Sequence, residues 1–214
     1  MPLVEAIVVM KNGGKYWLLI PLALWVVLLV ACGIPLDEFK PDWVPTVDLS
    51  YLINSNPAEV DNSDLPITPT DEIHVTGTPQ NVDIAEYRLT VDGLVETPLA
   101  LTYEDILSYP TITEVLLLIC PGTFADNAEW TGVPVSTLLA GAGLKPEASE
   151  VAFHALDGYR VVLPLENVQR DGVFLAHTVN GEVLPKIHGY PVRLVLRGIY
   201  GGDWVKWVTR LQIK

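Results

Sequence analysis

The sequence predicts an α+β fold in which mixed β-sheets are accompanied by short helices. Three observations support this prediction. Apolar runs of strand length recur through the C-terminal two thirds of the chain, helical patterns are few and short, and strands do not alternate regularly with helices as in βαβ units. The chain has 214 residues, of which 50% are hydrophobic, and this is enough apolar surface to form a core.

The first predicted strand covers residues 87–91, where apolar and polar residues alternate. It runs into Asp92-Gly93, a dipeptide typical of tight turns. The later runs are rich in branched apolar residues, which favour extended structure. Further strands are expected at residues 113–120, 151–155, 160–163, 173–176, 193–196 and 205–213.

Two short helices are expected between these strands. Thr102 is a favourable N-cap for a helix over residues 103–108, which has acidic residues in its first turn and ends before Pro110. Residues 135–143 form a second helical pattern that ends at glycine.

The first 32 residues read as a signal or anchor for a membrane. Residues 16–36 carry no charge, and about 20 apolar residues are needed to cross a bilayer. Either the segment is a lipoprotein signal that ends in Leu29-Val-Ala-Cys32, with Cys32 lipidated, or it is an uncleaved transmembrane anchor. Lys11 and Lys15 precede the apolar run, so both alternatives leave the rest of the chain outside the cytoplasm. The expected location is the extracytoplasmic side of the cell membrane.

Composition divides the remainder into a tether and a domain. Residues 33–70 are rich in Pro, Asp, Asn and Ser with little periodicity, which indicates a tether that holds the domain away from the membrane. The globular domain is expected over residues 71–214.

The net charge is −13, which argues against a nucleic-acid partner, because neutralising phosphates requires clustered Lys and Arg. Charge is also distributed unevenly. Residues 36–159 carry 3 basic and 21 acidic side chains, whereas residues 160–214 carry 8 basic and 4 acidic side chains. An anion is therefore expected to bind near the C-terminal quarter.

Cys120 ends the apolar run EVLLLIC, immediately before Pro121-Gly122. One interpretation is that the thiol fills the core, because free cysteines are often buried. The other is that its thiolate binds a thiophilic metal where the strand ends. If Cys32 is lipidated or lies in the membrane, Cys120 has no partner for a disulfide, because the chain has two cysteines.

A second cluster combines basic residues with glycine-rich turns. It comprises HGYPVR, which ends in Arg193, and the stretch from Arg197 to Trp207, which contains Lys206. Glycines let backbone N–H groups approach an anion while Arg and Lys neutralise it. The alternative is a solvated turn with ordinary surface charges. The chain contains no CxxCH motif for haem attachment, and no GxSxG, HExxH or GxGxxG motif.

Seven segments recur in a familiar order: YRLTVDGLV, the apolar strand into Cys120, WTGVPVSTLL, LDGYRVVLPLENV, VNGEVLP, HGYPVRLV and GIYGGDWVKWV. In this order they resemble the molybdopterin-binding domain of the sulfite oxidase family, which includes the catalytic subunit of the bacterial periplasmic methionine sulfoxide reductase. The resemblance covers residues 71–214. It implies a sulfite-oxidase-type fold, a molybdenum-molybdopterin cofactor and oxygen-atom transfer on a small substrate.

The resemblance also implies roles for individual residues. Cys120 is expected to be the thiolate ligand of molybdenum, and Tyr159 to lie near the metal's open position. Arg193 is expected to contact the cofactor's phosphate, and Arg197, which replaces a proline of the family pattern, to add a nearby cation. The expected cofactor contacts are His74, Cys120, His188, Arg193, Trp204, Val205 and Lys206.

The sequence therefore predicts a membrane-tethered molybdopterin-dependent oxidoreductase. Because it lacks a haem motif, electrons are expected to pass to or from a separate partner, a membrane haem protein or a cytochrome. The acids after Cys120, at Asp126 and Glu129, favour a neutral or cationic substrate over sulfite. The alternative is a metal-free member of the same fold that serves as an extracytoplasmic binding or assembly lipoprotein.

Overall fold

The computed structural model describes residues 9–12, 15–18 and 47–214. The chain divides into two compact units, residues 1–45 and 46–214. In the first unit, β1 (Val9–Asn12) and β2 (Lys15–Leu18) pair as antiparallel strands. The predicted lipidation site Cys32 and residues 19–36 of the apolar run lie outside the described residues. Within the part of the chain that is described, no helix has the length and apolar character required to cross a membrane.

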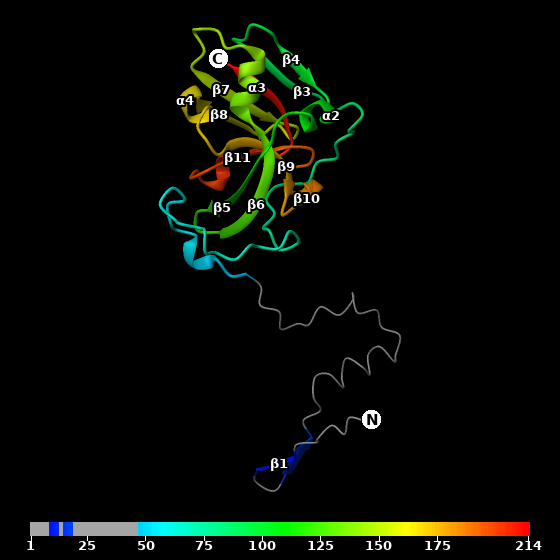
Figure 1. The fold of residues 1–214 in the computed structure, drawn as a ribbon, viewed down its shortest axis with the longest axis vertical. Helices are drawn as coiled ribbons and strands as arrows, with labels where there is room; N and C mark the ends of the chain where they lie inside the picture. Colours follow the sequence, from blue (N-terminus) through cyan, green and yellow to red (C-terminus); the bar gives the residue numbers. More distant parts are fainter. Residues whose placement is uncertain (1–8, 13–14, 19–46) are drawn as a thin grey trace. The chain divides into compact units, whose positions relative to one another are not determined.

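Two five-stranded sheets form the second unit (Figure 1). In one sheet, the order is β10-β9-β6-β5, β11 also pairs with β9, and all pairings are antiparallel. In the other, the order is β4-β3-β12-β7-β8, and β12 runs parallel to β3 and antiparallel to β7. The second sheet is mixed, as predicted, whereas the first is antiparallel throughout. Their strands are β3 (Leu89–Gly93), β4 (Leu99–Leu101), β5 (Ile112–Cys120), β6 (Phe124–Pro134), β7 (Glu150–Ala155), β8 (Arg160–Pro164), β9 (Val173–Val179), β10 (Glu182–Val183), β11 (Arg193–Leu196) and β12 (Val208–Ile213).

The helices are short and lie between strands. In α2 the Thr102 side chain accepts from the Asp105 backbone N–H, and the Asp105 carboxylate accepts from the Thr102 backbone N–H, which forms a capping box. Gly143 ends α3 with a φ of 69°, a conformation that favours glycine. Both predicted helices are therefore confirmed. The bounds are α2 (Tyr103–Leu107), α3 (Val135–Ala142), α4 (Leu165–Val168) and the 3₁₀ helices η1 (Ser50–Leu52), η2 (Lys186–His188) and η3 (Gly201–Asp203).

One apolar core includes side chains from both sheets. Leu118 on β5 and Trp130 on β6 belong to the same buried cluster as Val91 on β3, Phe153 on β7 and Leu211 on β12. Trp130, Phe153 and Leu211 are completely buried. At about 25 cal/mol per Å² of apolar surface removed from water, this core is the main stabilising contribution to the fold.

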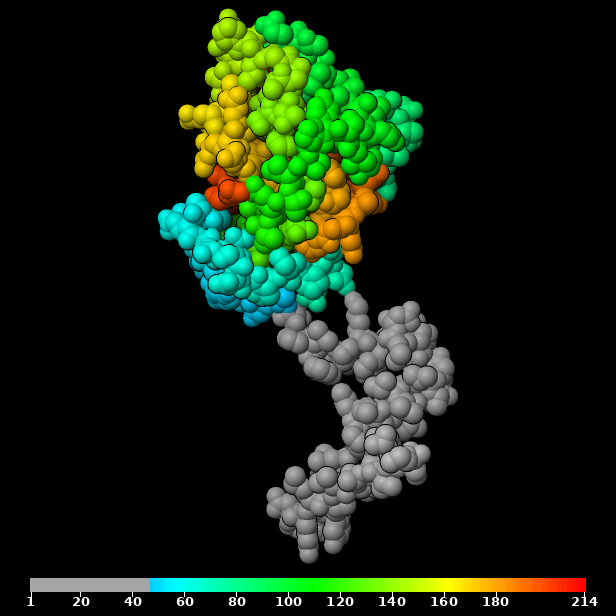
Figure 2. Space-filling model, in the orientation of Figure 1, coloured from blue at the N-terminus to red at the C-terminus, as the bar shows by residue number. Residues whose placement is uncertain are grey.

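The predicted tether is wrong for its second half, because the compact unit begins at residue 46 and not at residue 71. Leu49 and Leu52 are buried against Leu117 and Ile119 of β5. The backbone N–H of Gly122 donates to the carbonyl of Ile53 at 3.0 Å. Figure 2 shows this segment in cyan against the green part of the domain. The composition of residues 46–70 suggested a tether because it is rich in Pro, Asn, Asp and Ser, but these residues also form ordered turns on a protein surface.

Candidate functional site

Cys120 lines a cavity of ≈ 330 Å³ where β5 ends. Tyr159, Trp204 and Lys206 line the same cavity, so the fold brings four of the predicted site residues together. The other lining residues are Thr76, Gly77, Asp157, Gly201, Gly202 and Trp207.

The Gly201 turn approaches the thiol closely. A Cβ at Gly201 would lie 2.6 Å from Cδ1 of Leu118 and 3.1 Å from Sγ of Cys120, so only glycine fits without a rearrangement. Burial and the charge of Asp126 raise the pKa of the Cys120 thiol, and the Arg193 and Lys206 cations oppose this shift. Among the described residues, no group of three or more His, Cys, Asp or Glu side chains could hold a metal ion. A metal at Cys120 would need further ligands from a cofactor or solvent.

Arg193 is a buried cation in contact with two indole rings. Its Cζ lies 4.8 Å from the centre of the Trp130 ring and 5.7 Å from that of Trp204. One terminal nitrogen donates to the carbonyl of His188 at 3.2 Å, but Nε has no hydrogen-bond partner. None of the ion pairs in the described part of the chain involves Arg193. Burial lowers its pKa to about 10, which still leaves it charged near neutral pH. The charges of Cys120 and Asp126 favour the cation, but neither forms an ion pair with it, so an anion can be accommodated here.

Lys206 supplies a second cation. Its ammonium donates to the carbonyls of Thr76 and, at 3.4 Å, Ile187, and lies 4.6 Å from the centre of the Trp207 ring. Burial, followed by repulsion from Arg193, lowers the pKa of Lys206 to about 8. Arg193 and Lys206 both pack against Gly189, in the turn after η2. Gly189 has a φ of 116°, a conformation that favours glycine. A Cβ there would lie 3.0 Å from Cβ of Arg193 and 3.1 Å from Cβ of Lys206.

His188 is buried, and its Nε2 lies 3.1 Å from the carbonyl oxygen of Thr70. Because a carbonyl only accepts, Nε2 carries the proton. Burial lowers the pKa of His188 to about 4, so the ring is neutral near pH 7. His188 lines a different cavity, of ≈ 560 Å³, together with Thr70 and Pro185. It is not among the residues that line the cavity at Cys120.

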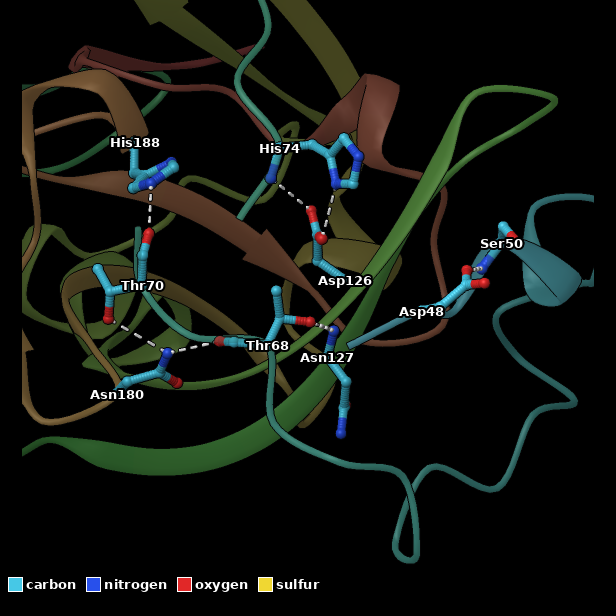
Figure 3. Close-up of polar contacts among 9 residues, drawn as sticks. All are labelled: Asp48, Ser50, Thr68, Thr70, His74, Asp126, Asn127, Asn180 and His188. Atoms are coloured by element: carbon cyan, nitrogen blue, oxygen red, sulfur yellow. Dashed lines mark hydrogen bonds and ion pairs between the residues drawn. The ribbon is translucent and has the colours of Figure 1, made fainter. Parts of the chain in front are cut away.

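The ring of His74 is turned toward Asp126 of β6 (Figure 3). Its Nδ1 and its backbone N–H both lie 2.9 Å from oxygens of the buried Asp126 carboxylate. The ring also stacks on Phe124, with centroids 4.6 Å apart and planes 4° from parallel. His74 does not line the cavity, although Thr76 and Gly77 do.

The aromatic and apolar members of the predicted set help to shape the cavity. The Tyr159 hydroxyl donates to the carbonyl of Gly202 at 2.7 Å, which joins the β7–β8 turn to η3. Trp204 donates from its indole N–H to the carbonyl of Ile199 at 3.0 Å. The Val205 carbonyl accepts from the backbone of β11 at 2.7 Å, so Val205 fixes the chain between two cavity-lining residues.

Arg197 lies elsewhere, and the expectation that it adds a cation beside Arg193 is wrong. Its guanidinium forms an ion pair with Glu114 at 2.6 Å. Together with Arg170 it lines a separate cavity of ≈ 530 Å³. Glu114 pairs with this cation, and the cations of the described chain that act on the Cys120 thiol are Arg193 and Lys206.

The cavity wall formed by Thr76 and Gly77 was not predicted, because that stretch lacks both periodicity and charge. Gly201 and Gly202 belong to the glycine-rich stretch for which close backbone approach was predicted, and both line the cavity. Asp126 was interpreted as an acid at the mouth, but it is buried.

Taken together, a soft thiol, two cations that form no ion pair in the described chain and two close-approach glycines define a binding domain for an anionic, metal-bearing cofactor. Residues 75–214 match the oxidoreductase molybdopterin binding domain, and the chain belongs to this family.

Relatives cover much of the chain. It is 32% identical over 142 residues to the uncharacterized oxidoreductase YuiH of Bacillus subtilis, covering 65% of this chain and 71% of that protein. It is 29% identical over 164 residues to mitochondrial sulfite oxidase of Macaca fascicularis, covering 63% and 30%. The crystal structure of the sulfane dehydrogenase SoxCD from Paracoccus pantotrophus matches with a TM-score of 0.66 and 35% identity, covering 74% of this chain and 45% of that one.

These matches confirm the sulfite-oxidase-type α+β fold, the oxidoreductase class and molybdenum-molybdopterin as the cofactor. The chain spans less than a third of the sulfite oxidase and less than half of the SoxCD chain. The site fits the cofactor chemically, because Cys120 offers a soft ligand and Lys206 a cation in the cavity wall, and the buried Arg193, whose charge acts on the Cys120 thiol, forms no ion pair in the described chain.

Proposed function

We propose that this protein is a membrane-tethered, extracytoplasmic oxidoreductase whose molybdenum is bound by Cys120 and whose small substrate enters the cavity of ≈ 330 Å³. The observation that carries the proposal is Arg193, a buried guanidinium without an acidic partner, on the side of the domain where the thiol lies. An anionic cofactor would supply the missing negative charge.

The chain's own residues bind and orient the cofactor. Cys120 would lose its proton on binding the metal, since a thiolate is the ligand form. Arg193 and Lys206 would neutralise the cofactor's anionic part, and His74, His188, Trp204 and Val205 would support its walls. When bound, the cofactor supplies two-electron oxygen-atom transfer.

The substrate would enter the cavity past Tyr159 and Asp157. Tyr159 stands there with its hydroxyl held by Gly202, so it would present a fixed aromatic edge to the substrate. Asp157 also lines the cavity, and its charge favours a neutral or cationic small molecule. Electrons would be exchanged with a separate membrane haem protein or cytochrome, because the sequence lacks a CxxCH motif.

Metal analysis tests the cofactor assignment. Protein produced in a host that makes the cofactor should contain about one molybdenum per chain. Cys120→Ser and Arg193→Met should lose it, whereas Arg197→Met, which removes an arginine that pairs with Glu114 and lines a separate cavity, should retain it. Wild-type protein without molybdenum would overturn the enzyme proposal and favour the metal-free binding lipoprotein.

Cell fractionation tests the anchor. The apolar run after Lys15 supports attachment, and a lipidated Cys32 would make it depend on that residue. Cys32→Ser should release the protein from membranes if the anchor is a lipid, and should leave it membrane-bound if the anchor is a transmembrane helix. Release of the wild-type protein by a salt wash would contradict both anchors.

A further inference from the structure

Residues 68–77 form a strap that runs past His188 to the wall of the Cys120 cavity (Figure 3). The strap has little secondary structure of its own and is held by side chains from the rest of the domain. Five residues hold the strap by hydrogen bonds, and we call them its anchors. Asn127 bonds to Thr68, Asn180 to Thr68 and Thr70, His188 to Thr70, Asp126 to His74, and Lys206 to Thr76.

Asp126 differs from the other anchors because it is a buried carboxylate that forms two hydrogen bonds with the same residue, His74. Its Oδ2 accepts from the His74 backbone N–H and its Oδ1 pairs with Nδ1, both at 2.9 Å, while only 1% of the Asp126 surface is exposed. Phe124 supports the ring from below by stacking. Charge-assisted bonds of this kind are about twice as strong as neutral ones.

The strand register places this anchor beside the thiol. Cys120 is opposite Phe124, and Leu118 is opposite Asp126. Directly opposite residues share a face of the sheet, and alternate residues of a strand return to the same face. Asp126 therefore stands one residue pair away from Cys120 on the same face.

The strap connects this anchor to the cavity. Two residues after His74, the Thr76 carbonyl accepts from the Lys206 ammonium, and Thr76 and Gly77 line the cavity. Without the hydrogen bonds between Asp126 and His74, the Thr76 carbonyl that orients Lys206 would lose its fixed position. The wall next to the thiol would open at the same point.

We propose that Asp126 is a positioning residue for the cofactor. Through His74 it fixes the strap, and through Thr76 it orients Lys206, without contacting the cofactor itself. This inference rests on the proposed function, because it assumes that the cavity holds molybdopterin.

The test compares Asp126→Ala with a control that loses a carboxylate elsewhere. The control is Asp92→Ala. In the wild type, Asp92 of β3 forms an ion pair with Arg210 of β12 at 2.8 Å. Molybdenum retained after dialysis is measured for both. Removing a residue that orients a ligand costs about 10- to 100-fold in metal affinity, so Asp126→Ala should lose most of its molybdenum and Asp92→Ala should keep it.

A conservative variant separates positioning from charge. The amide of Asp126→Asn can still accept from the His74 backbone N–H and donate to Nδ1 in the other tautomer. Molybdenum content should therefore be largely rescued. His74→Phe keeps the stacking but removes the Nδ1 bond, should lose molybdenum several-fold, and carries the test if Asp126→Ala does not accumulate as folded protein.

Hydrogen exchange provides a readout that is independent of the metal. The His74 amide should exchange about 10-fold faster or more in Asp126→Ala, and at the wild-type rate in Asp92→Ala. Unchanged exchange, or equal molybdenum loss in the two alanine variants, overturns the inference. Wild-type protein without molybdenum instead overturns the proposed function, and the exchange rates still decide whether Asp126 fixes the strap.

Discussion

The guanidinium carbon of Arg193 lies 4.8 Å from the centre of the Trp130 ring, and no carboxylate of the described chain forms an ion pair with it. The ring face attracts the cation, but such contacts contribute only about 1 to 2 kcal/mol. Removing a charge from water costs several kcal/mol even after the protein relaxes. The domain therefore carries an electrostatic cost at Arg193 that a bound anion would remove.

Arg193→Met should separate folding from cofactor binding. Without the cofactor, the variant should unfold at a higher urea concentration, with a gain of about 1 kcal/mol in the free energy of unfolding, because a buried charge without an ion pair is removed. With the cofactor available, wild-type protein should gain stability and Arg193→Met should not. Urea titrations of both proteins with and without the cofactor measure this, and a cofactor-free variant that is markedly less stable than wild type would contradict it.

His188 should make the domain sensitive to acid. Its folded pKa is about 4, below its ordinary value of 6.5, so the unfolded chain binds more protons between these values. The contribution of neutral His188 is present above pH 6.5 and is lost as the pH falls toward 4, by about 2 to 3 kcal/mol. His188→Gln can keep a donor for Thr70 and should flatten this part of the stability curve. Thermal unfolding from pH 4 to pH 7 measures it, and identical pH profiles would refute the assignment.

Local signals accounted for the elements that were predicted correctly. The α2 capping box is a contact between neighbours in the sequence, and the glycine after α3 adopts the left-handed conformation that its residue type favours. By contrast, β6 was missed, because its residues are buried on both faces and include Asp126 and Asn127. Those polar residues are satisfied by the strap, a partner about 50 to 60 residues away in the sequence.

Residue chemistry predicted the cavity better than it predicted orientations. Cys120 and Lys206 were recognised as a candidate metal ligand and a candidate anion contact, and the family resemblance decided between these roles and the alternatives of core filling and a solvated turn. The orientation of His74 could not be predicted, because it depends on the pairing of β5 with β6. The position of Arg197 could not be predicted either, because its ion-pair partner Glu114 is a residue 83 positions away in the sequence.

Leu49→Ala tests whether the segment before residue 71 belongs to the domain. Leu49 is 3% exposed and packs with Leu117 and Ile119, so its truncation should cost about 2 to 4 kcal/mol of unfolding free energy. Tyr51→Ala is the matched control, because Tyr51 is 67% exposed and should change stability by less than about 0.5 kcal/mol. If the two variants unfold at the same urea concentration, the segment is not part of the core.

Lys206 should couple anion binding to pH. Its folded pKa is about 8, below its ordinary value of 10.5, so its charge is present in the folded protein below pH 8 and is lost above it. Sulfate is a suitable probe because it does not titrate in this range. Its affinity for the cofactor-free protein should fall at least about 10-fold between pH 7 and pH 10, since a charge-assisted hydrogen bond contributes about 1.5 kcal/mol or more.

The lowered pKa of Lys206 also affects folding stability. Anion affinity should fall as the pH rises, whereas stability should rise. Between pH 8 and pH 10.5 the unfolded chain binds more protons than the folded chain at Lys206, so without an anion stability should rise with pH through this window. Cys120 titrates nearby, and its raised pKa acts against the rise, so the comparison is made in a Cys120→Ser background. Adding Lys206→Met to that background should abolish both the rise and the pH dependence of sulfate binding. If both persist, another group carries the charge.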